Sequence, residues 1–325
     1  IVDEETGRRR SALAEASWFE QVLRAYFPAQ LVERYGNQLN DHPLRREIIT
    51  TLVVNDMINR AGITFSFRAQ EATGASPDQI ARAYTVVREV FGLSQFWAAV
   101  ESAGMPVVAA TALHLECRRL LERAVRWLLQ SRQAQLDVVA EISRFQPGVA
   151  DLAPRIPELV QGFERERLRA RAADHEKLGT PPPLALTAAA LVDVFSLLDI
   201  IEITEATDRP AEQVASLYFT LSERFDIDRL LTLITALPQR DRWQSMARSA
   251  LRSDLYAALA DITSDVLATT NAHGSPGALA DRWEAQNSEG LAQVRNTLAA
   301  IDDTGTWDLA ELSVALRAIR TLVRS

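Results

Sequence analysis

The stretch EATGASPDQIARAYTVVREVFGL, residues 71–93, recurs in altered form as EATDRPAEQVASLYFTLSERFDI, residues 205–227, at a constant offset of 134. In both copies apolar residues follow the spacing i, i+3, i+4, i+7 and i+11, which places them on one face of a helix. A weaker similarity at the same offset joins residues 118–124 to residues 252–258. The sequence therefore predicts two related helical halves that arose by internal duplication. Identical residues occupy eight paired positions: Glu71 and Glu205, Ala72 and Ala206, Thr73 and Thr207, Gln79 and Gln213, Ala81 and Ala215, Tyr84 and Tyr218, Glu89 and Glu223, and Phe91 and Phe225.

Helical periodicity continues outside the repeated stretch. In HPLRREIITTLVVNDMINR, residues 42–60, apolar side chains recur three or four positions apart, and Pro43 suits the first turn of a helix. No segment has the period-two alternation of a strand, so the strand–helix alternation of a nucleotide-binding sheet is not expected. We predict an all-α fold with helices over residues 17–38, 42–60, 76–91, 93–103, 107–130, 133–145, 154–175, 184–206, 210–223, 227–237, 241–270, 277–299 and 307–324.

The clearest internal boundary is HEKLGTPPPL, residues 175–184, because its glycine and three prolines forbid a continuous helix. We predict a tail or linker from a preceding region over 1–16, a first helical half over 17–175, a linker over 176–183 and a second helical half over 184–325. The apolar run LALTAAALVDVFSLLDIIEI, residues 184–203, approaches the length of a membrane span. Its three acids, Asp193, Asp199 and Glu202, favour a buried helix instead.

Composition limits the partners and the compartment. The 325 residues carry a net charge of −8, which disfavours nucleic acid as a partner because binding to a phosphate backbone depends on Lys and Arg. Cys117 is the only cysteine, so we expect no disulfide framework and a cytoplasmic location. The chain opens on Ile1 and a charged segment, and we expect it to be part of a longer polypeptide.

The Gly-Ala-Ser segment at residues 74–76 raises the possibility of a phosphate-binding loop before a helix. The second copy argues against it, because Asp208 replaces Gly74 and would repel a phosphate. Ser76, Pro77 and Gln79 instead have the form of a capping box. We therefore predict that both copies mark helix starts, with Asp208 capping the second one.

Other candidates for chemistry are weak. His42, His114, His175 and His273 are far apart and form no metal-ligand motif. Cys117 precedes two arginines that could activate its thiol, but it is expected to pack as a small hydrophobic side chain.

The acidic and basic clusters are also expected to have structural rather than chemical roles. Asp199, Glu202 and Glu205 share a helix face that is expected to be solvated. Asp302 and Asp303 are expected in a turn before the last helix, within DDTGTWD, residues 302–308, which is predicted to form a turn and an N-cap. The charged segment FERERLRARAADHEK, residues 163–177, is predicted to be an exposed helix, or one that docks on an acidic surface. No residue is predicted to be catalytic, to bind a cofactor or to bind a metal.

Several segments resemble the C-terminal helical region of the large bacterial NAD-specific glutamate dehydrogenases. They are LRAYFPAQLVERYGNQLNDHPLRREIITTLVVNDMINRAGITFSFR, EATGASPDQIARAYTVVREVF, LLERAVRWLL, ISRFQPGV, LDIIEITEATDRPAEQVASLYFTL and DRWQSMARSALRSDLYAALADIT. The resemblance extends from about residue 18 to near the C-terminus. As a set these segments are specific to the family, although each alone is weak.

The resemblance implies an enzyme that interconverts glutamate and 2-oxoglutarate with ammonia, using NAD. In that family the substrate lysines and the dinucleotide fold lie in an upstream catalytic domain, and Lys177 is a poor candidate for such a lysine. We therefore expect no cofactor in this segment and a role in domain packing, oligomer assembly or regulation. Expected partners are the upstream catalytic domain and further copies in a homo-oligomer, with no nucleic acid and no membrane. The alternatives are a free-standing helical scaffold or interaction module, and a helical enzyme with its own pocket.

Overall fold

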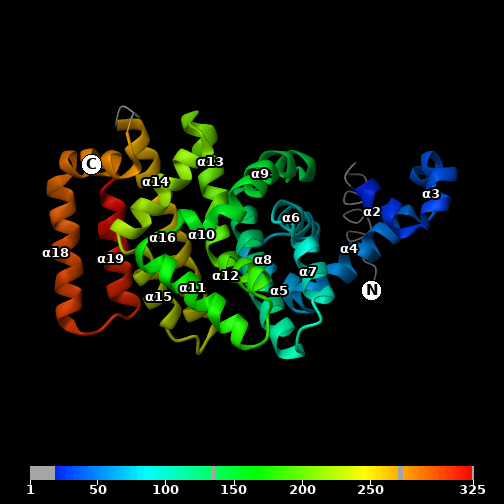
Figure 1. Ribbon diagram of the computed structural model, residues 1–325, viewed down its shortest axis with the longest axis horizontal. Helices are drawn as coiled ribbons and strands as arrows, with labels where there is room; N and C mark the ends of the chain where they lie inside the picture. Colours follow the sequence, from blue (N-terminus) through cyan, green and yellow to red (C-terminus); the bar gives the residue numbers. More distant parts are fainter. Residues whose placement is uncertain (1–18, 133–135, 270–273, 324–325) are drawn as a thin grey trace. The chain divides into compact units, whose positions relative to one another are not determined.

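The computed structural model describes residues 19–132, 136–269 and 274–323, and every regular element in these ranges is a helix. This confirms the predicted all-α class. Contacts divide the chain into two compact units (Figure 1). The first runs to Ala150 and takes in His175–Leu184, and the second contains Asp151–Asp174 and the chain from Ala185 onward. The sequence predicts the boundary between the halves at residues 176–183, which leaves residues 151–174 in the first half. The contacts place residues 151–174 in the second unit instead.

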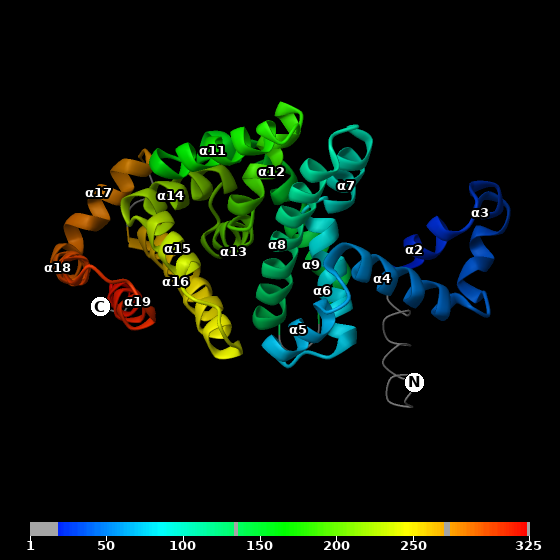
Figure 2. The ribbon, with the colours of Figure 1, turned by 90° about the horizontal axis from the view of Figure 1, so that it is seen from below.

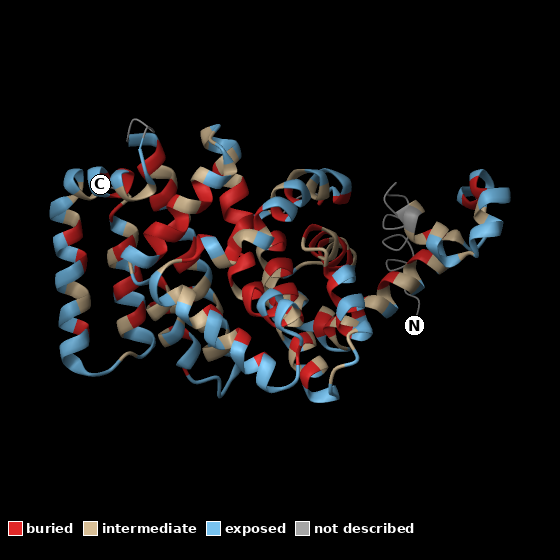
Figure 3. Cartoon of the chain, in the orientation of Figure 1, coloured by how far each residue is buried: buried red, intermediate tan, exposed pale blue. Residues whose placement is uncertain are grey.

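The first unit is built around α6, which packs along α8, with α4, α5 and α7 beside them (Figure 2). Its elements are α2 (Phe19–Tyr26), α3 (Ala29–Tyr35), the 3₁₀ helix η1 (Gly36–Asp41), α4 (Arg45–Ala61), α5 (Phe65–Thr73), α6 (Pro77–Val90), α7 (Leu93–Ser102), α8 (Val107–Ser131) and α9 (Val138–Leu152), whose last two residues fall in the second unit. The apolar stripe of α6, including Ile80, Tyr84 and Val87, is buried as the sequence predicts (Figure 3).

The second unit is built around α14, which contacts α13, α16 and α17. In the C-terminal part of the second unit, α19 packs on α16, and α18 packs on α19. Its elements are η2 (Ala153–Arg155), α10 (Ile156–Leu159), α11 (Gly162–Lys177, whose last turn falls in the first unit), α12 (Pro182–Val194), α13 (Leu197–Thr207), α14 (Ala211–Arg224), α15 (Ile227–Ala236), α16 (Arg242–Thr269), α17 (Pro276–Gln286), α18 (Ser288–Thr304) and α19 (Leu309–Thr321).

The segment between α5 and α6 is a helix start, as predicted. The Ser76 hydroxyl accepts from the Gln79 backbone N–H at 3.3 Å, the Gln79 side chain accepts from the Ser76 N–H at 2.8 Å, and Pro77 opens the helix. The prediction for Asp208 is wrong. Asp208 ends α13, and Pro210, which precedes α14, offers no side-chain cap.

The backbone repeats at the offset seen in the sequence. The pairs α6 and α14, and α7 and α15, have bounds that differ by 134 at each end. Gly74 and Asp208 both have left-handed φ, at 73° and 51°, and so do Gly92 and Asp226, at 58° and 55°. The two aspartates are the non-glycine residues with positive φ in the described chain. A common origin of the two halves by duplication stays a prediction that this agreement supports.

Several predicted helices are divided. Breaks fall at Pro28, at residues 160–161, at residues 195–196 and at Asn287, while α5 occupies a segment where the sequence predicts no helix. The break at 195–196 bends α12 and α13 by 55°. Among the described residues no single helix is long and apolar enough to cross a membrane. The bent pair α12 and α13 has the length and composition of a membrane span only when its two helices are counted together.

The left-handed positions predict a stability difference between substitutions at Asp226. Its side chain makes no cap hydrogen bond, so the φ of 55° is the main constraint on the residue. Glycine adopts this conformation without steric cost, whereas alanine does not. We expect Asp226→Gly to leave the free energy of unfolding unchanged or raise it by up to about 1 kcal/mol, and Asp226→Ala to lower it by about 1 kcal/mol. Urea denaturation measures both, and an alanine variant as stable as the glycine variant would contradict the assignment.

Candidate functional site

The charged helix α11 has a buried face. Leu168 and Ala172 are buried, so the helix that is predicted to be exposed, or to dock on an acidic surface, is exposed on one side only. Arg167 and Arg171 lie three and seven residues after Glu164, which brings all three side chains near this face. The sequence signal was ambiguous because charged residues recur along most of the helix, and Leu168 and Ala172 alone mark the buried face weakly.

Two ion pairs join α11 to neighbouring helices of the second unit. The Arg171 guanidinium donates to the Asp193 carboxylate of α12 at 2.6 Å and to the backbone carbonyl of Ala189 at 3.2 Å. Arg167 donates to both carboxylate oxygens of Asp228 on α15 at 2.9 Å. Asp193 is nearly inaccessible, and a buried carboxylate is tolerated when it is paired in this way. The arginines therefore fix how α11 lies against α12 and α15.

Glu164 lies within the same network. Burial raises the pKa of its carboxyl group well above the ordinary value, and the nearby carboxylates of Asp193 and Asp228 raise it further, against the opposing effect of Arg171 and Arg167. A carboxyl group surrounded in this way favours its protonated form. Raised carboxyl pKa values also occur at catalytic acids, but no other reactive side chain is paired with Glu164 in the described contacts.

A second set of buried residues with polar side-chain groups consists of Asp199 on α13 and Tyr218 on α14. Asp199 has only 7% of its surface exposed, so the prediction that it belongs to a solvated face is wrong, although Glu205 on the same helix is exposed. Burial raises the pKa of the Tyr218 hydroxyl, and the nearby Asp199 and Tyr256 raise it further. The hydroxyl therefore stays protonated near neutral pH.

The first unit holds the corresponding tyrosine in a different way. The Tyr84 hydroxyl donates to the Asp56 carboxylate at 2.7 Å, and Arg88 donates to the same oxygen at 2.7 Å. The position that matches Arg88 in the second unit is Ser222. Asp56 is not among the residues predicted from the sequence, where its only signal is an acid between the buried Val53 and Met57 of α4.

Cys117 lies at the centre of the first unit and is fully buried. Burial raises the pKa of its thiol to about 12, while a hydrogen bond with Trp97 acts in the opposite direction. The thiol is therefore protonated at neutral pH, in agreement with its prediction as a packing residue. Nearby on α8, burial lowers the pKa of His114.

The remaining candidates do not form a ligand cluster within the described ranges. No group of three or more His, Cys, Asp or Glu residues is placed there to hold a metal ion. His42 accepts from the Leu44 backbone N–H at 3.1 Å, and His175 is buried. His273 lies outside the described residues.

The acids before α19 are also placed differently from the prediction. Asp302 and Asp303 lie in the last turn of α18, whereas Asp308 caps α19 through a capping box with Glu311. Asp302 accepts from the Trp307 indole N–H at 2.9 Å and pairs with Arg229 on α15. The predicted turn and N-cap within residues 302–308 are present at Gly305, where φ is 69°, and at Asp308, but the placement of Asp302 and Asp303 in the turn is wrong because α18 continues to Thr304.

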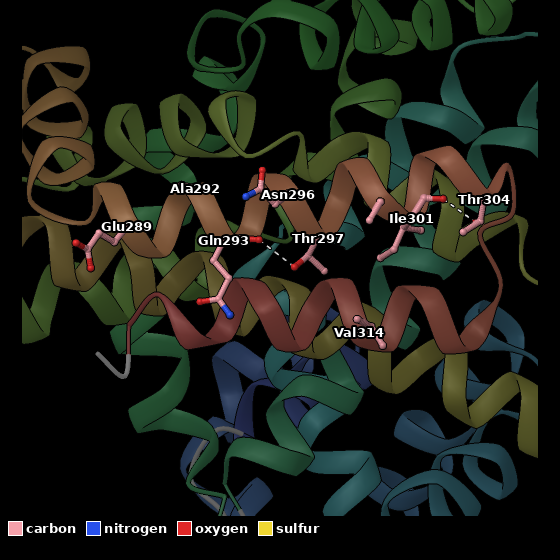
Figure 4. Close-up of a pocket in the computed structure, with 9 residues that line it drawn as sticks. Glu289, Ala292, Gln293, Asn296, Thr297, Ile301, Thr304 and Val314 are labelled. Atoms are coloured by element: carbon pink, nitrogen blue, oxygen red, sulfur yellow. Dashed lines mark hydrogen bonds between the residues drawn. The ribbon is translucent and has the colours of Figure 1, made fainter.

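A shallow groove of about 770 Å³ runs between α18 and α19 (Figure 4). Glu289, Gln293 and Asn296 give it polar groups, while Ile301 and Val314 give it an apolar floor near the far end. The Thr297 and Thr304 hydroxyls are used within α18, where they donate to the carbonyls of Gln293 and Ile301 at 2.9 and 2.7 Å. The groove contains no histidine, cysteine or basic side chain. It can cover an apolar surface, and the Glu289 carboxylate is the one lining group of the kind that acts as a general base.

Comparison with known proteins identifies the relatives of this chain. Residues 9–321 match the family described as the C-terminal part of glutamate dehydrogenase. The chain is 39% identical over 317 residues to an NAD-specific glutamate dehydrogenase of Mycobacterium tuberculosis, covering 96% of this chain and 19% of that protein. It is 33% identical over 318 residues to that of Pseudomonas aeruginosa, covering 97% and 20%, and 31% identical over 308 residues to that of Halomonas elongata, covering 94% and 19%. The chain therefore spans about a fifth of the length of these relatives.

The ion pair between Arg171 and Asp193 predicts a measurable coupling. Replacing Arg171 with Met removes the charge but keeps much of the apolar stem, and we expect the free energy of unfolding to fall by about 2–3 kcal/mol. Arg169→Met, on the exposed part of α11, is the matched control and should change it by less than about 0.5 kcal/mol. A double-mutant cycle with Asp193→Leu measures the coupling. A coupling energy near zero would show that the pair does not hold α11 in place.

The raised pKa of Glu164 predicts a pH-dependent difference between the wild type and Glu164→Gln. As the pH rises above the ordinary carboxyl value of 4.5, the unfolded chain releases the Glu164 proton while the folded protein retains it. The wild type therefore loses stability relative to Glu164→Gln, and the difference stops growing above the folded-state pKa. Urea denaturation of both proteins between about pH 4 and pH 8 measures it. A difference that is constant, or that shrinks as the pH rises, would contradict the buried protonated carboxyl.

Proposed function

Because the chain belongs to the family of the glutamate dehydrogenase C-terminal region, we propose that it is the non-catalytic helical part of an NAD-dependent glutamate dehydrogenase. The whole enzyme converts glutamate, NAD and water to 2-oxoglutarate, ammonia and NADH in this proposal. The observation that carries it is the match over residues 9–321, combined with the small share of each relative that the chain covers. Most of each relative's length is left for a catalytic region.

The residues of this chain do not fit NAD. Dinucleotide sites of the common type place the pyrophosphate at a glycine-rich turn between a strand and a helix, and the described ranges contain no strand. In the groove between α18 and α19, Glu289 is the only charged lining residue, and it would repel a pyrophosphate. We therefore derive no step of the reaction from this chain and place NAD in the catalytic region of the proposed parent enzyme.

The proposed role is positional. Within the second unit the ion pairs from Arg167 and Arg171 hold α11 on its neighbours, and within the first unit Asp56 joins Tyr84 to Arg88. Such internally fixed helices provide rigid surfaces for the upstream catalytic region and for further copies of the enzyme. Small changes at those contacts would then alter the catalytic cleft, which is a route to regulation. The proposal places the enzyme in the cytoplasm, where the free Cys117 thiol stays reduced.

The proposal predicts that this chain alone does not reduce NAD with glutamate, whereas the full-length protein does. The assay follows NADH absorbance at equal molar concentrations of the two proteins. Circular dichroism of the isolated chain is the control for folding, since an unfolded chain would be inactive for a trivial reason. Turnover by the folded chain comparable to that of the full-length protein would place a catalytic site here. A full-length protein without glutamate-dependent activity would favour the alternative of a helical scaffold.

A further inference from the structure

The first described elements form an arm at one end of the first unit. This arm, residues 19–44, consists of α2, α3, η1 and the turn before α4. Its main contacts outside itself are those of α2 and η1 with α4, and α3 is held chiefly by η1. Figures 1 and 2 both show α3 lying beyond α2 and α4, away from the α6 and α8 core of the same unit.

The helix α3 lacks the packing that usually stabilises a short helix. It has seven residues, none of them buried. Isolated helices of this length are unstable in water, because too few hydrogen bonds offset the cost of nucleation. A covering surface would supply the missing stabilisation.

The arm exposes several large apolar side chains among its polar ones. Leu31 and Tyr35 lie one turn apart on the same face of α3 and are 44% and 40% exposed. Tyr26, at 54%, and Leu44, at 56%, add further apolar surface on the arm. The intervening Glu33 and Arg34 cancel in charge, so the arm offers no electrostatic attraction for a polyanion. An exposed leucine and tyrosine on one helix face with little net charge are typical of a protein–protein contact.

The length of the relatives identifies the occupant. About four-fifths of each relative lies outside the matched region, and the family description places that region at the C-terminus. The arm is the described part of the chain that is nearest in sequence to such preceding polypeptide. Attachment to the same chain gives that polypeptide a high effective concentration at the arm. Resting on the function proposed above, we propose that Leu31, Tyr35 and Tyr26 pack against the polypeptide that precedes this region in the whole enzyme.

Amide hydrogen exchange tests this contact in the full-length protein and in the isolated chain. The amides of residues 29–35 are expected to exchange at least about tenfold more slowly in the full-length protein, because docking suppresses the opening of α3. The double variant Leu31→Asp/Tyr35→Asp should remove this protection. The matched control, Gln30→Asp/Asn37→Asp, adds the same charge at exposed polar positions of the arm and should retain it.

Equal exchange of residues 29–35 in the two wild-type proteins would overturn the inference. Protection that appears in the isolated chain and increases with its concentration would also overturn it, by identifying a second copy as the occupant. Thermal unfolding of the isolated variant checks that the substitutions act on docking, since these exposed residues should leave its Tm unchanged. Glutamate-dependent NAD reduction by the same full-length preparation separates the two proposals. An active enzyme with an unprotected arm overturns the arm contact alone, whereas an inactive enzyme overturns the proposed function.

Discussion

Burial of the apolar stripe of one central helix is the interaction on which each unit depends. In the first unit α6 buries Ile80, Tyr84 and Val87 against α8 and its neighbours, and in the second unit α14 buries the matching residues. Each fully buried side chain of this size contributes about 1.5–3 kcal/mol, which exceeds the net contribution of a typical hydrogen bond. Other helices take their positions from this contact, because their own apolar faces must cover what the central helix leaves exposed.

Polar interactions then fix details that apolar burial leaves open. Apolar contacts are non-directional, so a helix such as α11, whose buried apolar side chains are Leu168 and Ala172, could slide on its neighbours. Its ion pairs to Asp193 and Asp228 fix one orientation. Apolar burial likewise places Tyr84 and Tyr218 at matching positions of the two units, although the polar residues around their hydroxyl groups differ.

Much of the fold could be predicted because its signals are local. The helical period, the capping box at Ser76 and the offset between the repeats all depend on residues within a few turns of one another. The break at Pro28 also has a local signal in its proline, whereas the bend within the predicted helix 184–206 has none. The bend at residues 195–196 contains neither proline nor glycine, and the apolar run continues through it. The burial of Asp199 and the network around Glu164 depend on which helices meet, and sequence spacing gives no information about that.

The sequence by itself determined the helical class, the repeated central helix and the family to which the chain belongs, because periodicity and motif similarity are properties of the chain alone. The tertiary structure decided which charges are buried and paired and which apolar residues stay uncovered. Arg171 and Arg169 have the same side chain on one helix, yet only the packing of α12 distinguishes the ion-paired residue from the exposed one. Leu31 and Leu168 are both leucines on helices, and only the presence of neighbouring helices buries the second, whereas the first stays exposed.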